Sequence, residues 1–356
     1  MNKILEISLK VLSPVHISSG KEIQNNEYII KNNKFCRFNF NKLITKLDDN
    51  EKEKLLKEIE EKSPNKIRTN INSFLNEKFN KIDFEYKINI EKIKGKIEGE
   101  KIDNLIQDLY EKNLKQISIE KSNSLNIKEF INVYYKKYIP GSSIKGAIRT
   151  ALIDQSFSND YDKLEKDKKI NEDYFKNLIV TDSKFNTDNE NIEISAISRA
   201  SKNNFIEVLQ PNFETRFYIK IRNDDKFNEN NIIRSINNFY KKNLLFYIDK
   251  LKDVNEKLNN DDRKDKERKK ERNRKVIFQF KKILKIINEL EENEFILNIG
   301  FGGGKIFKTV DSKISGIEKR FRPSFKNKLN LGTLEIPYTV SLVNEKIMGW
   351  VKCKIL

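Results

Sequence analysis

Residues 139–150, which read Ile-Pro-Gly-Ser-Ser-Ile-Lys-Gly-Ala-Ile-Arg-Thr, have the composition and spacing of an anion-binding helix start. The Pro-Gly pair favours a sharp turn, and Ser142 or Ser143 is predicted to cap a helix that begins near Ile144. The first turn of that helix would present free backbone N–H groups at the positive end of the helix dipole. Phosphate is the ligand that this arrangement favours.

Two cations strengthen this hypothesis. Lys145 and Arg149 are four residues apart and therefore share one face of the predicted helix. Gly146 lies between them, and a glycine in a helix costs stability unless a strand or a nucleic-acid chain must approach the backbone closely. The alternative is an ordinary loop-to-helix junction whose cations sit in solvent.

A second candidate site is the segment 300–304, Gly-Phe-Gly-Gly-Gly, which holds four of the chain's 12 glycines. Such a loop can adopt positive φ angles, bring N–H groups close to a phosphate and avoid collision with a bound strand. Lys305 and Lys308 follow the loop and add positive charge.

Neither segment matches a nucleotide-binding motif. Glycines 141 and 146 have Walker-type spacing, but Ala147-Ile148 stands where a Lys-Ser/Thr pair should follow. In the second segment, Lys305 occupies the place of the third glycine of a dinucleotide motif. We therefore expect no nucleotide and no other cofactor.

His16 is the only histidine, so any histidine-dependent proton transfer must use it. It precedes a small-residue loop that carries Ser18, Gly20 and Lys21. A hydrogen-bonding or stacking role is favoured, because no second histidine offers a complementary acid or base. The carboxylates form no compact metal-ligand pattern, and Asp182, at the expected end of a strand, is predicted to be a structural cap. No metal site is expected.

The charge of the chain points to a polyanionic partner. Seventy basic and 53 acidic residues give a net charge of +17, which favours nucleic acid through steering and counterion release. The abundance of Asn and Ile beside Lys also fits a biased base composition. A hydrophobic content of 37% with 23 Phe and 12 Tyr excludes wholesale disorder, and 356 residues suffice for one elaborated domain or two small ones.

The cysteines and the N-terminus predict a cytoplasmic protein that does not contact a membrane. Cys36 and Cys353 form no CxxC or Cys/His cluster, so neither a zinc site nor a disulfide is indicated. Met1 leads directly into residues 4–12 without the apolar run of a signal peptide, and no stretch approaches the length of a membrane span.

Hydrophobic periodicity predicts a mixture of strands and helices. Strands are expected at residues 3–12, 28–30, 178–182, 192–199, 213–222, 333–342 and 346–355. Helical patterns cover 41–131 and 228–294, and a charged run at 261–275 interrupts the second. Such runs are typical of solvated helix faces or loops.

Three segments in this order resemble a known family. They are Leu12-Ser-Pro-Val-His-Ile-Ser-Ser-Gly20, Tyr138-Ile-Pro-Gly-Ser-Ser-Ile-Lys-Gly-Ala-Ile-Arg-Thr150, and the glycine segment 300–304 with Lys308-Thr309. Together they resemble the RAMP superfamily of CRISPR proteins. The size, the order of motifs and the ending Met348-Gly-Trp-Val351 are most similar to the fifth subunit of type III-A (Csm) effector complexes. The segment 207–211 before Phe213 and Phe217 also resembles the approach to a palm strand, with Asn212 where Gly is common.

The resemblance implies an α+β fold with a ferredoxin-like, RRM-type palm, large helical insertions and an extended finger. Residues 1–40 and 132–227 would form the palm, with the finger near 183–212, and 41–131 would be a helical insertion. Residues 228–356 would add a helical segment, the glycine-rich loop and the C-terminal strands that complete the palm.

The resemblance also implies a function. The chain would be a non-catalytic subunit that binds the guide RNA (crRNA) and caps its 3′ end in antiviral defence, with a part in crRNA maturation. Its partners would be crRNA, target RNA, other Csm subunits, especially the backbone subunit, and recruited host nucleases. The target-cleaving aspartate of the backbone subunit lies after the first strand, whereas residues 18–26 here contain Glu22 but no Asp.

The predicted RNA-binding residues combine hydroxyls, glycines and cations with one histidine. They are His16, Ser18, Gly20, Lys21, Ser142, Ser143, Lys145, Arg149, Arg199, Lys202, Gly300, Gly302, Gly303, Gly304, Lys305 and Lys308. Two alternatives remain open: a metal-independent crRNA-processing endoribonuclease of the Cas6 type that uses His16, and the repeating backbone subunit of the same complex.

Overall fold

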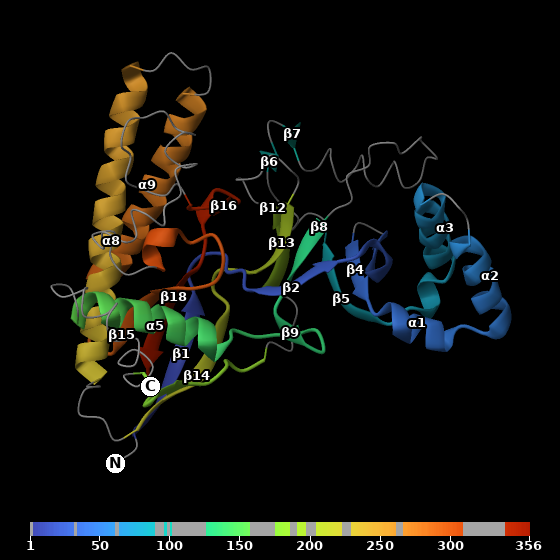
Figure 1. Cartoon of the computed structure of the whole chain (residues 1–356), viewed down its shortest axis with the longest axis horizontal. Coiled ribbons are helices and arrows are strands. Elements are labelled where there is room, and N and C mark those ends of the chain that lie inside the picture. The colour runs from blue at the N-terminus through green and yellow to red at the C-terminus, as the bar shows by residue number, and fades with distance from the viewer. Residues whose placement is uncertain are drawn as a thin grey trace, which may run out of the picture. The chain divides into compact units, whose positions relative to one another are not determined.

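The computed structural model is a mixed α+β fold that divides into two compact units (Figure 1). It describes residues 3–31, 34–60, 64–89, 96–97, 100–101, 126–156, 175–185, 191–196, 204–222, 229–260, 266–308 and 339–356. Unit 1 consists of Met1–Ile17, Tyr138–Asn186 and Leu209–Leu356, and unit 2 of Ser18–Lys137 and Thr187–Val208.

Unit 1 is built on a five-stranded sheet in the order β11-β14-β1-β18-β15. These strands are β11 (Leu178–Val180), β14 (Glu214–Ile221), β1 (Lys3–Val11), β18 (Trp350–Ile355) and β15 (Glu294–Asn298). The first strand of the chain thus lies at the centre, antiparallel to both β14 and β18. A short hairpin, β16 (Leu342–Val343) and β17 (Lys346–Ile347), precedes β18.

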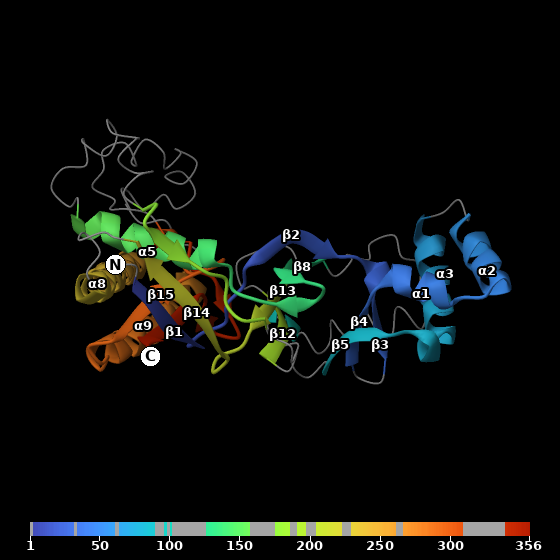
Figure 2. The same ribbon diagram turned by 90° about the horizontal axis from the view of Figure 1, so that it is seen from below.

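The burial of β1 alternates as its sequence predicts. Leu5, Ile7, Leu9 and Val11 are buried, while Ile4 on the opposite face is 63% exposed. The described residues of this unit form the helices α5 (Gly141–Ser156), α8 (Glu229–Lys257) and α9 (Lys266–Asn288). Helix α8 packs against α5, α9 and β15, and α8 and α9 lie side by side in both views (Figures 1 and 2).

An aromatic cluster forms the centre of unit 1. The indole of Trp350 is fully buried, with its ring centroid 5.0 Å from that of Phe307 and 5.5 Å from that of Tyr240. Phe280 of α9 lies 5.6 Å from Phe307 in an edge-to-face arrangement. Because aromatic residues bury a large apolar area, this cluster fixes α8 and α9 against the C-terminal strand.

The described part of unit 2 contains a four-stranded sheet, a three-stranded sheet and the helices α1, α2 and α3, besides two short hairpins. The four-stranded sheet has the order β12 (Ile192–Ala196), β13 (Asn204–Leu209), β8 (Asn126–Phe130), β2 (Ser18–Ile23). The three-stranded sheet consists of β3 (Tyr28–Lys31), β4 (Lys34–Phe38) and β5 (Phe84–Asn89). Helices α1 (Phe40–Lys46), α2 (Asp49–Ile59) and α3 (Pro64–Glu77) bury Leu43, Leu47, Leu55, Phe74 and Leu75 in one cluster with Phe38.

Among the residues that the structure describes, the remaining short elements are two hairpins and four 3-10 turns. The hairpins are β6 (Lys96–Ile97) with β7 (Glu100–Lys101), and β9 (Asn132–Val133) with β10 (Lys136–Lys137). The 3-10 turns are η1 (Asn25–Glu27), η2 (Phe79–Lys81), η5 (Leu258–Asn260) and η6 (Lys305–Phe307). No helix in the described part of the chain is long and apolar enough to cross a membrane.

Several expected elements differ from those found. The segment 41–131 is not wholly helical, because β5 and β8 lie within it and pair with β4 and with β13 and β2. The charged run is helical from Lys266 onward, so the loop explanation is wrong for 266–275. Residues 18–40, assigned to the palm, lie in unit 2 because β2 pairs with β8 and β4 with β5. The expected strand at 333–342 is described only from 339.

Candidate nucleic-acid interface

The start of α5 differs from the sequence prediction. The helix begins at Gly141, three residues before Ile144, and both serines lie inside its first turn. Instead of a serine, Asp182 caps the helix: its Oδ1 accepts a hydrogen bond of 2.7 Å from the Gly141 N–H. The predicted structural role of Asp182 is confirmed. Since its carboxylate already occupies the helix N-terminus, a phosphate could not take that N–H.

Close packing explains why the helix starts with glycine. A Cβ atom on Gly141 would lie 2.3 Å from the carbonyl oxygen of Val180 in β11. Two further hydrogen bonds hold the same junction, because the N–H of Ile139 donates to Ser183 Oγ and its carbonyl accepts from the Ser183 N–H, each at 2.9 Å. The turn before α5 is therefore fixed by the segment that follows β11.

The exposed side of α5 presents the features that the sequence predicted for RNA binding. Ser142 and Arg149 are exposed and Lys145 is half-buried, at helical spacings that place them on one side. Gly146 is also exposed, and a Cβ atom built on it would have nothing within 4 Å outside its own helix. Helix-to-sheet packing within the described chain therefore does not explain this glycine.

Lys145 and Arg149 are held in place by one neighbouring residue. The Lys145 Nζ donates a hydrogen bond of 2.9 Å to the carbonyl oxygen of Phe175, and the guanidinium of Arg149 lies 5.5 Å from the centroid of the Phe175 ring. Partial burial, together with repulsion from Arg149, lowers the pKa of Lys145 below its usual value of 10.5. We name the surface formed by Ser142, Lys145, Gly146 and Arg149 the α5 face.

The glycine segment 300–304 has reasons within the chain for its composition. Gly300 has φ +71°, and a Cβ atom on it would lie 2.3 Å from the carbonyl oxygen of His16. A Cβ atom on Gly302, at φ +81°, would lie 2.6 Å from the sulfur of Met348, and one on Gly303 2.0 Å from Oδ1 of Asn298. Close approach of RNA is thus not needed to explain these glycines.

The residues in and after this segment differ in their exposure to solvent. Gly303 and Gly304 are buried, whereas Phe301, Lys305 and Lys308 are exposed. The N–H of Lys305 donates to Thr339 Oγ1 at 2.7 Å. Lys305 is exposed, whereas burial around the ammonium of Lys308 lowers its pKa to about 8, although part of that residue is also exposed.

His16 lies inside unit 1 rather than in an open groove. Its side chain is 1% exposed and its ring meets that of Phe301 edge to face at 6.2 Å. The His16 carbonyl accepts a hydrogen bond of 2.7 Å from the Phe301 N–H, which joins the first loop to the glycine segment. An imidazole this deeply buried cannot reach an RNA phosphate in this conformation.

The segment 18–21 lies in unit 2, at the start of β2. Ser18, Gly20 and Lys21 are exposed, and Gly20 has φ +83° with nothing near the position of a Cβ atom. The Ser18 hydroxyl accepts from the Gly20 N–H at 3.0 Å, and the register of β2 on β8 shifts between Ser18 and Glu22. This bulge exposes backbone and one cation. Arg199 and Lys202 lie outside the described residues.

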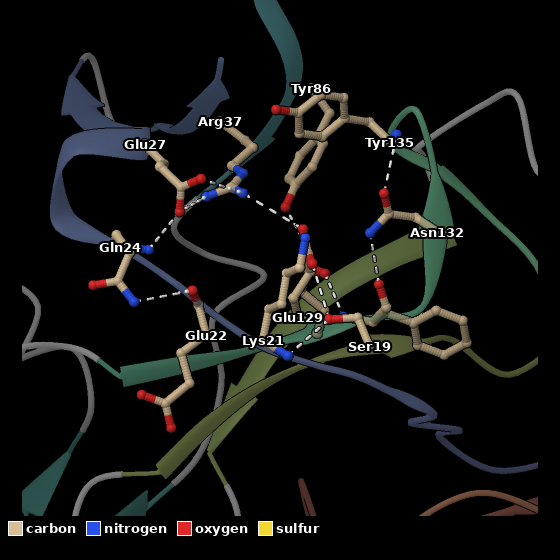
Figure 3. A network of polar contacts seen from close by, with 12 residues as sticks. Ser19, Lys21, Glu22, Gln24, Glu27, Arg37, Tyr86, Glu129, Asn132 and Tyr135 are labelled. Atoms are coloured by element: carbon tan, nitrogen blue, oxygen red, sulfur yellow. Dashed lines mark hydrogen bonds and ion pairs between the residues drawn. The ribbon is translucent and has the colours of Figure 1, made fainter. Parts of the chain in front are cut away.

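A buried polar network in unit 2 was not anticipated from the sequence (Figure 3). Lys137 and Glu207 are both 0% exposed and form an ion pair with an Nζ–Oε2 distance of 2.6 Å. Glu207 also accepts hydrogen bonds from the Tyr86 hydroxyl and the Phe130 N–H. Arg37 pairs with Glu27 and Glu129 nearby. No spacing in the sequence marks these residues, which come from six different elements.

Burial alone would raise the pKa of Glu207. The positive charge of Lys137 and the hydrogen bonds from Lys137, Tyr86 and Phe130 outweigh that effect and hold the pKa below its usual value of 4.5. The same burial, beside the negative Glu207, raises the pKa of the Tyr86 hydroxyl well above 10.0. The carboxylate is therefore ionised and fully bonded, which suits a structural role.

Metal ligands and reactive thiols were also sought in the described ranges. No cluster of three or more His, Cys, Asp or Glu residues there could hold a metal ion. Cys36 and Cys353 are free and buried, and burial raises the pKa of both thiols.

Comparisons with known proteins identify the family of the chain. The model of the RAMP superfamily matches residues 8–308, and the chain belongs to that superfamily. It is similar to the CRISPR system Cms protein Csm5 of Methanocaldococcus jannaschii, with 27% identity over 333 residues, or 86% of this chain and 72% of that protein.

Two solved structures share the fold. One chain of a Csm-crRNA-target RNA ternary complex of a type III-A CRISPR-Cas system matches with a TM-score of 0.61 at 20% identity, over 98% of this chain and 100% of that one. The crystal structure of T. onnurineus Csm5 matches with a TM-score of 0.55 at 19% identity over the same shares. The fold of this chain is thus similar to the folds of these two proteins.

Proposed function

We propose that this chain is a non-catalytic, RNA-binding subunit of a type III-A CRISPR effector complex that caps the 3′ end of the crRNA. The observation that carries the proposal is the α5 face, which combines exposed Arg149, half-buried Lys145 and a glycine with open space around it. RNA binding without sequence preference needs cations and accessible backbone rather than a catalytic array. Proteins of this fold occur in a complex with crRNA and target RNA, which supports the same partners here.

The architecture of unit 1 supports a ferredoxin-like palm. The elements β1, α5, β11, β14, α8 and β18 follow the β-α-β-β-α-β order of that fold, with α9 and β15 as additions. Their sheet places the first strand between the third and the fourth, because β1 pairs with β14 and β18. The finger would then be supplied by the segment near 183–212, and the complex would act in the cytoplasm.

The burial of His16 favours a subunit without nuclease activity. A general acid or base must lie within hydrogen-bond reach of the proton that it transfers, and the imidazole is 1% exposed. The segment 18–26 supplies Glu22 but no aspartate, unlike the cleaving loop expected of a backbone subunit. Its part in crRNA maturation would therefore be to recruit host nucleases.

RNA affinity tests the α5 face. The double variant Lys145→Ala/Arg149→Ala should bind single-stranded RNA about tenfold more weakly, and its slope of log K against log salt should fall by about 1.4. Lys241→Ala/Lys252→Ala, on exposed positions of α8, removes the same charge as a control. If both double variants keep the wild-type affinity and salt slope, the α5 face is not part of the interface.

A cleavage assay tests the absence of catalysis. Purified protein incubated with repeat RNA, with and without EDTA, should leave the RNA intact. Metal-independent cleavage that is lost in His16→Ala would favour the processing nuclease and contradict the proposal.

A further inference from the structure

Helix α9 carries a large share of the positive charge of the chain. Its 23 residues, KERKKERNRKVIFQFKKILKIIN, contain ten lysines and arginines against two glutamates, a net charge of +8 out of +17 for all 356 residues. Both glutamates lie near its N-terminus and are paired within the helix, Glu267 with Lys270 and Glu271 with Lys275. From residue 274 to residue 285 the helix contains no acidic residue.

The cations of this C-terminal half share one side of the helix. Val276, Phe280, Ile283 and Ile287 are buried and face the aromatic core of unit 1. The opposite side is exposed and follows a helical spacing of three to four residues over roughly 16 Å. We name it the α9 stripe, and it consists of Arg274, Phe278, Lys281, Lys282 and Lys285.

An exposed aromatic ring lies in the middle of the α9 stripe. Phe278 is 57% exposed, although the same helix buries its other phenylalanine, Phe280, completely. The Lys282 Nζ lies 4.4 Å from the centroid of the Phe278 ring. Lys285 lies near the carboxylate of Glu289, with an Nζ–Oε1 distance of 3.9 Å. The stripe thus combines cations with an aromatic platform.

This combination fits single-stranded RNA better than an acidic protein surface. Cations alone would suit either partner. RNA and an acidic protein surface would each neutralise the positive charges that repel one another along the helix. An exposed ring between cations adds a surface on which a base of any sequence can stack while its phosphates meet the lysines. A carboxylate-rich surface would give the ring nothing to stack on.

We propose that the α9 stripe is a second contact site for single-stranded RNA, apart from the α5 face. Arg274, Lys281, Lys282 and Lys285 contact phosphates, and one base stacks on Phe278. The inference rests on the proposed function only in assuming that the chain binds RNA. It assigns a role to the charged helix that neither the family motifs nor the α5 face explains.

The test uses the full chain and a labelled single-stranded oligouridine. The stripe variant neutralises the four cations, as Arg274→Gln/Lys281→Gln/Lys282→Gln/Lys285→Gln. A control removes the same charge from exposed positions of α8, as Arg234→Gln/Lys241→Gln/Lys252→Gln/Lys257→Gln. The stripe variant should bind at least about tenfold more weakly and lose about 2.8 from the slope of log K against log salt. The α8 variant should bind more tightly than the stripe variant.

Variants of Phe278 distinguish an RNA partner from a protein partner. Phe278→Ala should weaken oligouridine binding by roughly 5- to 100-fold, and Phe278→Tyr should keep the affinity, because stacking needs only an aromatic face. Both changes are on the surface, so thermal unfolding should remain close to that of the wild type.

Two outcomes would overturn the inference. Equal affinities of the stripe and α8 variants would mean that the stripe is a solvated helix face. Unchanged oligouridine binding by Phe278→Ala, with polyglutamate bound as tightly as oligouridine, would indicate an acidic protein partner instead. If oligouridine binding depends on Lys145 and Arg149 but not on the stripe, only this inference fails and the proposed function stands.

Discussion

Two glycines at the start of α5 have opposite physical roles. A Cβ atom on Gly141 would collide with the Val180 carbonyl at 2.3 Å, whereas Gly146 has nothing nearby. Gly146→Ala should therefore raise the free energy of unfolding by up to about 1 kcal/mol, because alanine is the better helix former. If an RNA chain approaches the helix at this point, the same variant should bind RNA more weakly. Urea unfolding and RNA titration measure the two effects.

Gly141→Ala is the matched control for that experiment. It should lower the free energy of unfolding by about 1–3 kcal/mol, because the backbone of β11 must move. A Gly146→Ala protein that is more stable and binds RNA as tightly as the wild type would show that RNA does not approach this glycine closely.

The Lys137–Glu207 pair makes a prediction about stability. Glu207→Gln leaves the fully buried Lys137 without its counter-charge, so the free energy of unfolding should fall by about 3–5 kcal/mol. Lys137→Met/Glu207→Gln removes both charges and should recover part of that loss. Equal stability of the single and double variants would show that the pair is not a coupled unit. Urea unfolding at neutral pH provides the comparison.

The Lys137–Glu207 pair should also affect how the free energy of unfolding changes at acid pH. The pKa of Glu207 is lowered from 4.5 in the folded chain, so its contribution is complete above that value and is lost as the pH falls through the lower, folded pKa. Between neutral pH and the acid range, the double variant should lose less stability than the wild type. Identical pH slopes would contradict the assignment.

At the residue scale, the sequence predicted chemistry where the neighbours are local. The α5 cations share a face because four residues separate them. Asp182 was predicted to be a cap from its place at the end of a strand, although the helix that it caps begins 41 residues earlier. The burial of His16 and the Lys137–Glu207 pair could not be predicted, because partners 70 or more residues away decide them.

At the element scale, the Asp182 cap joins α5 to the segment after β11. Asp182→Ala should lower the free energy of unfolding by about 1 kcal/mol, because the Gly141 N–H loses its acceptor. Asp182→Asn keeps an oxygen at that position and should cost less. Thermal unfolding of the three proteins measures the difference, and an Asn variant as unstable as the Ala variant would argue that charge rather than hydrogen bonding matters.

Elements with a clear period were predicted well, and those defined by distant pairing were not. The alternation of Phe217, Ile219 and Ile221 marked β14, and the apolar spacing of Val276, Phe280 and Ile283 marked α9. In contrast, β8 is a short strand whose pairing with β13 and β2 brings together segments far apart in the chain. The start of α5 was misplaced for a similar reason, since its capping residue lies 41 positions further on.

At the scale of the whole molecule, the proposed capping role makes a prediction about copy number. Native mass spectrometry of the reconstituted complex should count a single copy of this chain per crRNA, as a cap requires. Several copies would indicate the repeating backbone subunit. The net charge of +17 was readable from the sequence, but the division into two units was not, because both contain segments from widely separated parts of the chain.

Site-specific crosslinking tests the central claim most directly. A crRNA with 4-thiouridine at its 3′ end, assembled into the complex and irradiated, should crosslink to this chain within Gly141–Ser156, the helix that carries the α5 face. The same label at the 5′ end should not crosslink to this chain. If the 3′ label crosslinks only to other subunits, or the 5′ label crosslinks to α5, the chain is not the 3′ cap.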